Sequence, residues 1–288
     1  MTLAGYTDSE LECFFANSPS ITTTRQEVVR RISPHLVAKP VPWLCDPQDE
    51  VLALRLARSV GVNVPIVQRV VSCEDESHLI IMDYIDGMTL EQAWRSMSLF
   101  ATLRVAWQLR AYLRSTASIV AQTTGGVHSG RSHSEWLQGQ YGPVPHASPT
   151  LYRDYLNWWL TECRPAECRP RRELLVPAEP HHILVHQDLA PRNMILDSKG
   201  ALWVIDWGHA GFYPPYMEYG GMEAMGHAMP WLSAPTWAAW WGRLRWSLLR
   251  LIAFGYRRYY DTRLKALEIV RQRSLRYRLA RGPFSEER

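Results

Sequence analysis

Three polar side chains lie close together in the sequence: Asp188, Asn193 and Asp206. A carboxylate and an amide oxygen suit Mg²⁺, which usually takes its remaining ligands from water and substrate phosphates. A further carboxylate that holds no metal can accept the proton of an attacking hydroxyl group. Phosphoryl transfer needs this division of roles, because its catalysis consists mainly of positioning and charge neutralisation. The residue types therefore predict Asp188 as the base and Asn193 and Asp206 as magnesium ligands.

The residues between these side chains predict a β-hairpin that brings them together. Two short apolar runs, residues 194–196 and 201–205, flank Asp-Ser-Lys-Gly, which is a good turn sequence. Symmetric pairing across this turn places Leu196 opposite Ala201. The two expected metal ligands then lie side by side at the open end of the hairpin, and the expected base reaches the same end through one short loop. Each aspartate alone could simply cap a turn, but their joint spacing favours a site.

This stretch resembles the catalytic loop of protein kinases and of their small-molecule relatives. His186, Asp188 and Asn193 match the pattern H-x-D-x-x-x-x-N, and Asp206-Trp207-Gly208 resembles D-F-G. The sequences HQDLAPRN and IDWGHAGFYPPYMEY are closer to the aminoglycoside-phosphotransferase-like and choline-kinase-like family than to protein kinases. The resemblance extends over about residues 28–219 and is specific only from the catalytic loop onward.

The resemblance implies a role for each motif residue. Asp188 is implied as the catalytic base, and Asn193 and Asp206 as the ligands of Mg²⁺. His186 is implied as a packing residue that supports the loop. The family also implies a bilobal, protein-kinase-like fold with ATP as co-substrate. The expected activity is transfer of the γ-phosphoryl group to a hydroxyl group of a small-molecule acceptor.

Lys39 resembles the strand lysine that holds the α- and β-phosphates of ATP. The chain has only three lysines, the others being Lys199 and Lys265. Such scarcity favours a specific role, because a compact ammonium group acts as a point charge that a guanidinium fork does not replace well. The resemblance implies Glu50, in the first turn of the following helix, as the partner of Lys39. Asp49 competes for that role, and either acid could simply stabilise the helix N-terminus.

The segment Met82-Asp83-Tyr84-Ile85 occupies the place of the hinge that meets adenine through backbone groups. Met82 and Tyr84 are therefore candidate nucleotide-binding residues, although a strand that ends in a turn would look the same. The sequence departs from the protein-kinase pattern upstream of the lysine. It has no G-x-G-x-x-G, and Ser33-Pro34 is the only turn between the first two expected strands.

The elements around the site predict an α+β fold with two lobes. We expect strands at residues 25–32, 35–39, 64–71 and 78–84, and a helix from Asp46-Pro47 to about Gly61. Beyond Asp86-Gly87 nearly everything is expected to be helical, apart from one strand region within residues 182–207 and a long surface connection at residues 122–149. The expected division is a small β-rich N-lobe (1–84), a hinge (85–88) and a larger helical C-lobe (89–288) that carries the catalytic hairpin.

Composition narrows the classes of protein. The 288 residues are 47% apolar and 21% charged, which is typical of a globular chain. The N-terminus lacks the features of a signal peptide, so we expect a cytoplasmic protein. The apolar segment at residues 236–260 is interrupted by arginines, which argues against a membrane span. The net charge of +4 comes without a nucleic-acid-reading motif, so no nucleic-acid partner is expected, and the oligomeric state stays open.

Two other functions remain compatible with the sequence. A catalytically inactive kinase-like binding or regulatory module is suggested by the missing glycine loop and by the arginine-rich tail after Asp261. A magnesium-dependent phosphohydrolase could use Asp188 and Asp206. Inactive modules tend to lose the aspartates, whereas this chain keeps them, and we therefore favour the kinase.

The segment after Tyr219 carries the only features that bear on the acceptor. Its helices have far more arginine than acid, which argues against a polycationic acceptor. Its tryptophans could line an acceptor pocket, but at helical spacings they are more often core. They are Trp231, Trp237, Trp240, Trp241 and Trp246.

Overall fold

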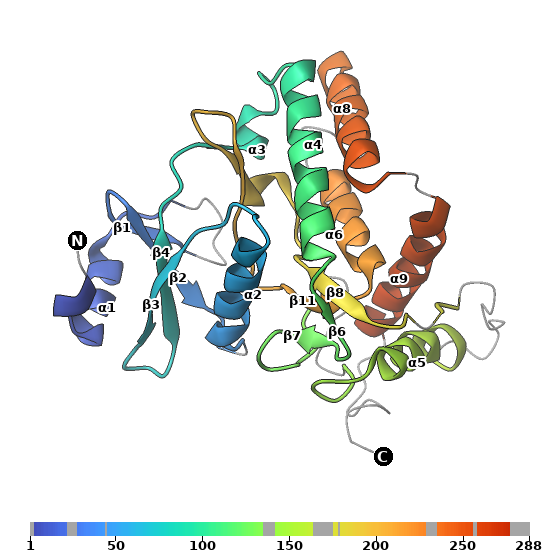
Figure 1. Cartoon of the computed structure of the whole chain (residues 1–288), viewed down its shortest axis with the longest axis horizontal. Coiled ribbons are helices and arrows are strands. Elements are labelled where there is room, and N and C mark those ends of the chain that lie inside the picture. The colour runs from blue at the N-terminus through green and yellow to red at the C-terminus, as the bar shows by residue number, and fades with distance from the viewer. Residues whose placement is uncertain are drawn as a thin grey trace.

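The computed structural model describes residues 3–21, 28–43, 45–134, 142–163, 175–177, 179–228, 235–255 and 258–276. The chain forms a sheet-rich N-terminal part and a larger, mainly helical part that follows it (Figure 1). This arrangement agrees with the expected α+β fold. The division into lobes at residues 85–88 stays a prediction.

The N-terminal part is a four-stranded antiparallel sheet in the order β1-β2-β4-β3. Its strands are β1 (Arg30–Ser33), β2 (Leu36–Val41), β3 (Val67–Ser72) and β4 (His78–Asp83). Successive side chains of a strand point to opposite faces, so Ile81 packs with Leu11 of α1 (Asp8–Asn17) and Ile80 packs with Val51 of α2 (Pro47–Ser59). Both faces of the sheet are therefore covered.

The four expected strands and the expected helix are present in this part, whereas the helix α1 was not expected. The helix begins as predicted, because the side chain of Asp46 accepts a hydrogen bond from the N–H of Gln48 and a proline follows the cap. The first strand is shorter than expected, and residues 25–27 lie outside the described part of the chain. The chain around Ser20 also pairs with β1, which was not expected: Ser20 forms an antiparallel bridge with Arg30, and the N–H of Arg31 donates to the carbonyl of Pro19 at 3.2 Å.

The larger part contains more strands than the sequence suggested. They are β5 (Met88–Thr89), β6 (Val120–Ala121), β7 (Gly125–Gly126), β8 (His182–Val185), β9 (Met194–Leu196), β10 (Leu202–Val204) and β11 (Gly211–Tyr213). They form two small sheets, β10-β9-β5 and β6-β8-β11-β7. The expectation of a single strand region within residues 182–207 was wrong, because strands of two or three residues, some of them glycines, carry no hydrophobic period.

The connection at residues 122–149 is also not simply a surface loop. It contains β7, and both glycines of this strand are buried. Thr124 is buried as well and bonds to the ring of His182, with 2.9 Å between Oγ1 and Nδ1. The polar and glycine-rich composition of this connection predicted that it would be exposed. Its residues in β7 are buried because they form a strand of the sheet β6-β8-β11-β7.

Helices make up most of the second part and enclose two apolar clusters. They are α3 (Leu90–Ala93), α4 (Leu99–Thr116), α5 (Pro149–Thr161), α6 (Pro215–Ala228), α8 (Trp237–Phe254) and α9 (Arg258–Arg276), and a short 3-10 turn, η4, spans Pro191–Asn193. One cluster joins α2, α4 and α8 to the hairpin, and the other joins α5, α6 and α9. None of the helices in the described ranges combines the length and apolar character needed to cross a bilayer.

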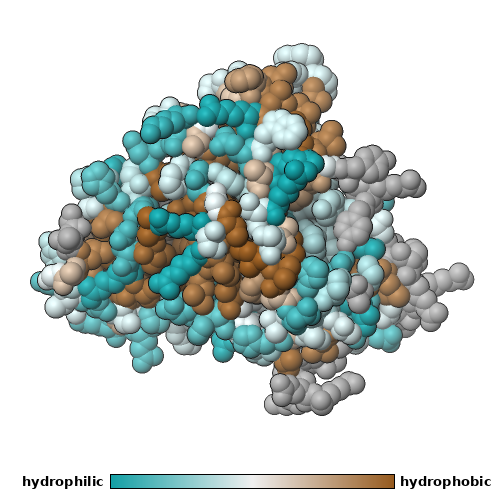
Figure 2. Space-filling model, viewed as in Figure 1, coloured by the Kyte–Doolittle hydropathy of each residue, from teal (hydrophilic) through white to brown (hydrophobic). Residues whose placement is uncertain are grey.

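The tryptophans of α8 divide between core and surface. Trp246 is buried and meets Trp94 edge to face, with 5.5 Å between the ring centroids. Trp237 is 74% exposed, and Trp240 and Trp241 are also exposed. Apolar residues gather on the surface over this end of α8 and the neighbouring end of α4 (Figure 2). The core interpretation therefore holds for Trp246 only, and Trp231 lies outside the described residues.

Two of the three arginines in α8 are structural. Arg245 is buried, donates to the carbonyl of Trp94 at 2.7 Å and to that of Met97, and stacks over the ring of Trp94. Arg250 is buried and donates to the hydroxyl of Tyr219 at 2.9 Å. Arg245 and Arg250, two of the arginines that interrupt the apolar segment, therefore join α8 to its neighbours.

Replacing Arg245 should destabilise the fold far more than replacing its exposed neighbour on the same helix. We expect Arg245→Met to lower the free energy of unfolding by about 3 kcal/mol, because the buried carbonyl of Trp94 and the partly buried carbonyl of Met97 lose their donor. Arg243→Met should change it by less than about 0.5 kcal/mol. Urea-induced unfolding measures both values, and equal losses would contradict a structural role for the Arg245 guanidinium.

Candidate active site

The hairpin β9–β10 forms as expected but with a different register. Leu196 pairs with Leu202, not with Ala201. The turn holds one more residue than expected, because the carboxylate of Asp197 accepts hydrogen bonds from the backbone N–H groups of both Lys199 and Ala201. Shifting one strand by one residue would normally exchange the faces of its side chains. The open end of the hairpin nevertheless holds the expected residues, because Asn193 and Asp206 lie beyond the paired residues of both strands.

The open end of the hairpin brings the expected residues together. The N–H of Ile205 donates to the carbonyl of Asn193 at 2.9 Å, which places Asp206 directly after this pair. The amide nitrogen of Asn193 donates to Asp188, at 3.0 Å to the carbonyl oxygen and 2.8 Å to Oδ2. Because the nitrogen is used in this way, the amide oxygen of Asn193 is left to coordinate another group.

Asp188 is buried, and its two carboxylate oxygens differ. Oδ2 accepts from Asn193 and also from Arg192, whose Nη2 lies 2.5 Å away. No described residue donates to Oδ1, which is buried. A buried polar atom without a partner is uncommon and calls for an explanation. Oδ1 would need no partner in the protein if Asp188 were a base that accepts the proton of a substrate at this oxygen.

Lys39 joins the two parts of the chain at this point. Its ammonium group is buried and lies 3.1 and 3.0 Å from the two carboxylate oxygens of Glu50. It also lies 2.5 Å from Oδ1 of Asp206. The expected pair of Lys39 and Glu50 is therefore present, whereas Asp49, the competing acid, bonds to the backbone and hydroxyl of Ser129.

The donor set of Asn193 and Asp206 fits a hard divalent cation. Burial by itself would raise the pKa of Asp206, but the ion pair and hydrogen bond with Lys39 outweigh burial and lower it to about 2. Asp206 is thus a carboxylate at neutral pH. Its backbone has φ of +64°, which is unusual for a residue other than glycine. The amide oxygen and this carboxylate are the ligand types that Mg²⁺ prefers.

His186 contacts the loop and the end of the hairpin, as a supporting residue would. Its Nε2 donates to the carbonyl of Ile205 at 2.9 Å, and its Nδ1 accepts from the N–H of Asp188 at 3.2 Å. Its ring meets Trp207 edge to face at 4.8 Å. Burial lowers the pKa of His186, which agrees with a neutral ring that donates on one side and accepts on the other.

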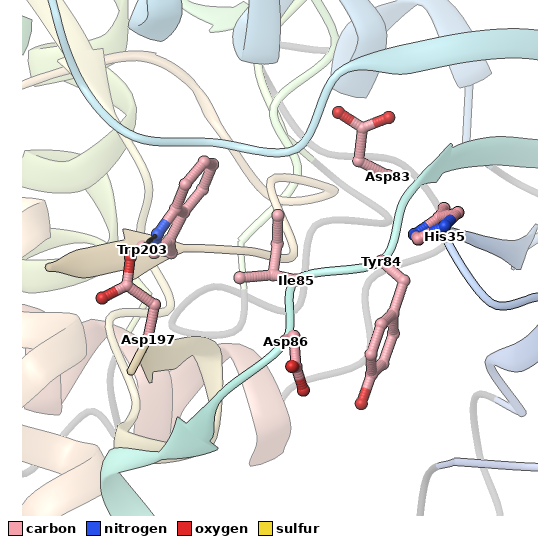
Figure 3. Close-up of a pocket in the computed structure, with 7 residues that line it drawn as sticks. All are labelled: His35, Asp83, Tyr84, Ile85, Asp86, Asp197 and Trp203. Atoms are coloured by element: carbon pink, nitrogen blue, oxygen red, sulfur yellow. Dashed lines mark hydrogen bonds between the residues drawn. The ribbon is translucent and has the colours of Figure 1, made fainter. Parts of the chain in front are cut away.

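The expected hinge segment, residues 82–85, spans the end of β4 and borders a pocket. The backbone N–H of Tyr84 donates to the carbonyl of His35 at 2.8 Å, so this group belongs to the N-terminal part. Met82 is buried in the sheet, opposite Val37. The side chains of Asp83 and Tyr84 point to opposite sides of the hinge backbone (Figure 3). The pocket, of about 360 Å³, is lined by His35, Asp83, Tyr84, Ile85, Asp86, Asp197 and Trp203, and it contains none of the residues around Lys39.

Comparison with known proteins identifies the family. The family model described as "Phosphotransferase enzyme family" matches residues 20–234, which is most of the chain. The chain belongs to the phosphotransferase enzyme family. No curated protein matches the sequence.

Solved structures show the same fold. The GDP and kanamycin complex of APH(2")-IIia is 16% identical, with a TM-score of 0.53, and the match covers 90% of this chain and 84% of that chain. Aminoglycoside phosphotransferase APH(4)-Ia is 15% identical, with a TM-score of 0.51, and the match covers 93% of this chain and 99% of that chain. The expected bilobal, protein-kinase-like α+β fold is confirmed.

Sequence reasoning missed Glu218 of this phosphotransferase, which lies beneath the loop that carries Asp188. Its Oε2 accepts a hydrogen bond from the backbone N–H of His186. The same helix comes very close to the loop, since a Cβ at Gly221 would lie 2.1 Å from the carbonyl oxygen of Gln187. In the sequence, Glu218 looks like any acid in the first turn of a helix. Only the tertiary structure shows that it bonds to the backbone at His186.

Burial raises the pKa of Glu218 to about 8, although hydrogen bonds from the backbone of His186 and Gln187 oppose the shift. Between about pH 4.5 and pH 8 the folded chain therefore keeps a proton that the unfolded chain releases. The stability due to this proton is complete below pH 4.5 and is lost as the pH rises through 8.

Glu218→Gln should remove this pH dependence. Relative to the variant, the wild type should lose a few kcal/mol of unfolding free energy between pH 5 and pH 9, at about 1.4 kcal/mol for each pKa unit. Urea unfolding at several pH values measures the difference. Parallel curves for the two proteins would mean that Glu218 does not hold this proton.

Proposed function

We propose that this phosphotransferase transfers the γ-phosphoryl group of ATP, bound together with Mg²⁺, to a hydroxyl group of a small molecule. The observation that carries the proposal is the environment of Asp188. Two donors hold one oxygen of its carboxylate, while the other oxygen has no partner among the described residues. The adjacent Asn193 and Asp206 supply the ligand types that magnesium prefers.

In this proposal Asp188 acts as the base. The hydroxyl oxygen of the acceptor forms a bond to the γ-phosphorus, and the bond from that phosphorus to the bridging β-γ oxygen breaks. ADP leaves with the electron pair, and the hydroxyl proton passes to Oδ1 of Asp188. Asn193 and Arg192 hold Oδ2, and so they fix the direction in which Oδ1 faces.

The remaining residues bind the nucleotide. Lys39 would contact its α- and β-phosphates, with Glu50 holding the ammonium group in place. Asn193 and Asp206 would hold Mg²⁺, which when bound neutralises charge on the β- and γ-phosphates. Met82 and Tyr84 would border the adenine, and the contact of Tyr84 would not use its N–H, which is bonded to His35.

Replacing the base should separate binding from transfer. Asp188→Asn should keep the affinity for Mg·ATP within about twofold and lower transfer by at least about 100-fold, because the proton acceptor is lost. Transfer is measured with labelled ATP and a panel of alcohols. An Asp188→Asn variant with full transfer to any alcohol would show that another group is the base.

Replacing the metal ligand should instead weaken nucleotide binding. Asp206→Ala should weaken Mg·ATP binding at least about tenfold, because a charged ligand of the cation is removed. Calorimetric titration of ATP with and without Mg²⁺ measures this. Absence of binding to the wild type at millimolar ATP would favour an inactive module, and release of phosphate to water in preference to an added alcohol would favour a phosphohydrolase.

A further inference from the structure

The first turn of α2 carries two neighbouring acids that have different partners. Glu50 turns to the site lysine, whereas Asp49 reaches a loop of the second part of the chain, residues 126–131. Oδ1 of Asp49 accepts hydrogen bonds from the backbone N–H groups of His128 and Ser129, at 2.7 and 2.8 Å. Oδ2 accepts from the hydroxyl of Ser129 at 2.6 Å. Donors from a single loop therefore occupy both oxygens.

The loop has the shape needed to receive this carboxylate. Its backbone closes on itself, because the N–H of Gly126 donates to the carbonyl of Arg131 at 2.9 Å and that of Gly130 donates to the carbonyl of Gly126 at 3.0 Å. Gly130 has φ of +63°, a conformation that favours glycine. A Cβ at Gly126 would lie 2.4 Å from Oδ2 of Asp49. Glycine at this position therefore lets the helix approach the loop.

The loop is joined to both sides of the catalytic machinery. It begins at Gly126, the last residue of β7, and β7 pairs with β11, the strand after Asp206. β11 also pairs with β8, the strand that runs into His186. A second contact joins the loop to the same helix end, because Nδ1 of His128 lies 2.8 Å from Oδ2 of Asp46, the N-cap of α2. Figure 1 shows β7 beside this helix.

We propose that residues 126–131 clamp α2 to the second part of the chain, so that Asp49 positions Glu50, and through it Lys39, opposite Asp206. Asp49 is then a positioning residue for nucleotide binding. The inference rests on the proposed function, because it gives Lys39 the role of binding phosphates.

Loss of the clamp would change the charges that Lys39 meets. If α2 moved away, Glu50 would leave Lys39, and Asp206 would be the carboxylate that remains beside the ammonium group in the described part of the site. With Glu50 gone, Lys39 would compete more strongly with the metal ion for Asp206. The clamp would therefore control the affinity for Mg·ATP without touching the nucleotide.

A simpler role for Asp49 is to stabilise the N-terminus of α2 by its negative charge. This role needs the charge but not the loop. Asn keeps the shape of Asp and an oxygen that can accept from both N–H groups, and its amide nitrogen can donate to Ser129. Asp49→Asn should therefore preserve the clamp, whereas Asp49→Ala should remove it. A role of the charge alone would make the two variants equally defective.

The first test measures amide hydrogen exchange of residues 47–59 in the full chain without nucleotide. Asp49→Ala should speed exchange at least tenfold, Ser129→Ala should act in the same direction to a smaller extent, and Asp49→Asn should stay close to the wild type. Glu74→Ala, an exposed acid of the same part of the chain, serves as the control and should have no effect. Unchanged exchange in Asp49→Ala, or equal acceleration in the Ala and Asn variants, would overturn the clamp.

The second test measures the affinity for Mg·ATP by calorimetry in a double-mutant cycle. Glu50→Gln should weaken binding about tenfold, and Asp49→Ala should weaken it less. If Asp49 acts through Glu50, the double variant should bind as weakly as Glu50→Gln alone. If the losses of affinity in the two single variants multiply in the double variant, the two acids act independently, and the positioning role is overturned. If the wild type binds no Mg·ATP, the proposed function and the positioning role both fail, and the exchange data still decide whether the clamp exists.

Discussion

The structure of the site depends on one buried ammonium group. Lys39 lies between Glu50 of α2 and Asp206 at the end of the hairpin, so a single charge joins the sheet, the helix and the second part of the chain. Taking charges out of water is costly unless each has a partner, and a buried pair that loses one partner destabilises the fold strongly. One cation between two carboxylates leaves a net negative charge, which favours the approach of a further cation.

The backbone around the site is bent to allow these contacts. Gln187 and Asp206 both have positive φ angles, of 68° and 64°. Such conformations persist in residues other than glycine only where the surroundings hold them. The side chain of Gln187 donates to the carbonyl groups of His133 and His209, and His186 fastens the loop to Ile205. The conformation that presents Asp188 and Asp206 is thus maintained by hydrogen bonds on both sides.

The sequence predicted well the part of the site whose residues are near one another along the chain. Asp188, Asn193 and Asp206 are near one another along the chain, so a turn sequence and two apolar runs sufficed to bring them together. The register was wrong by one residue because the side chain of Asp197 extends the turn. This error did not matter, since the expected metal ligands lie beyond the paired strands.

The sequence was uninformative where the structure depends on distant contacts. The choice between Glu50 and Asp49 is made by a glycine-containing loop about eighty residues away, which has no hydrophobic period to reveal it. Arg245 and Arg250 likewise bond to groups of the fold. Their presence after Tyr219 therefore says nothing about the charge of an acceptor. These two arginines no longer argue against a cationic substrate.

The two carboxylates that pair with Lys39 also bear on the proposed binding of the nucleotide. An ammonium group that already meets two carboxylates gains little from a phosphate unless one of them finds another partner. Glu50 is held by the helix, and the clamp would keep that helix in place, so Asp206 is the partner that must be released. If Lys39 binds the phosphates as proposed, it would turn to them from Asp206 once another cation takes its place beside that carboxylate. In the proposed function, nucleotide and metal therefore bind as coupled events, because both require the same ion pair to open.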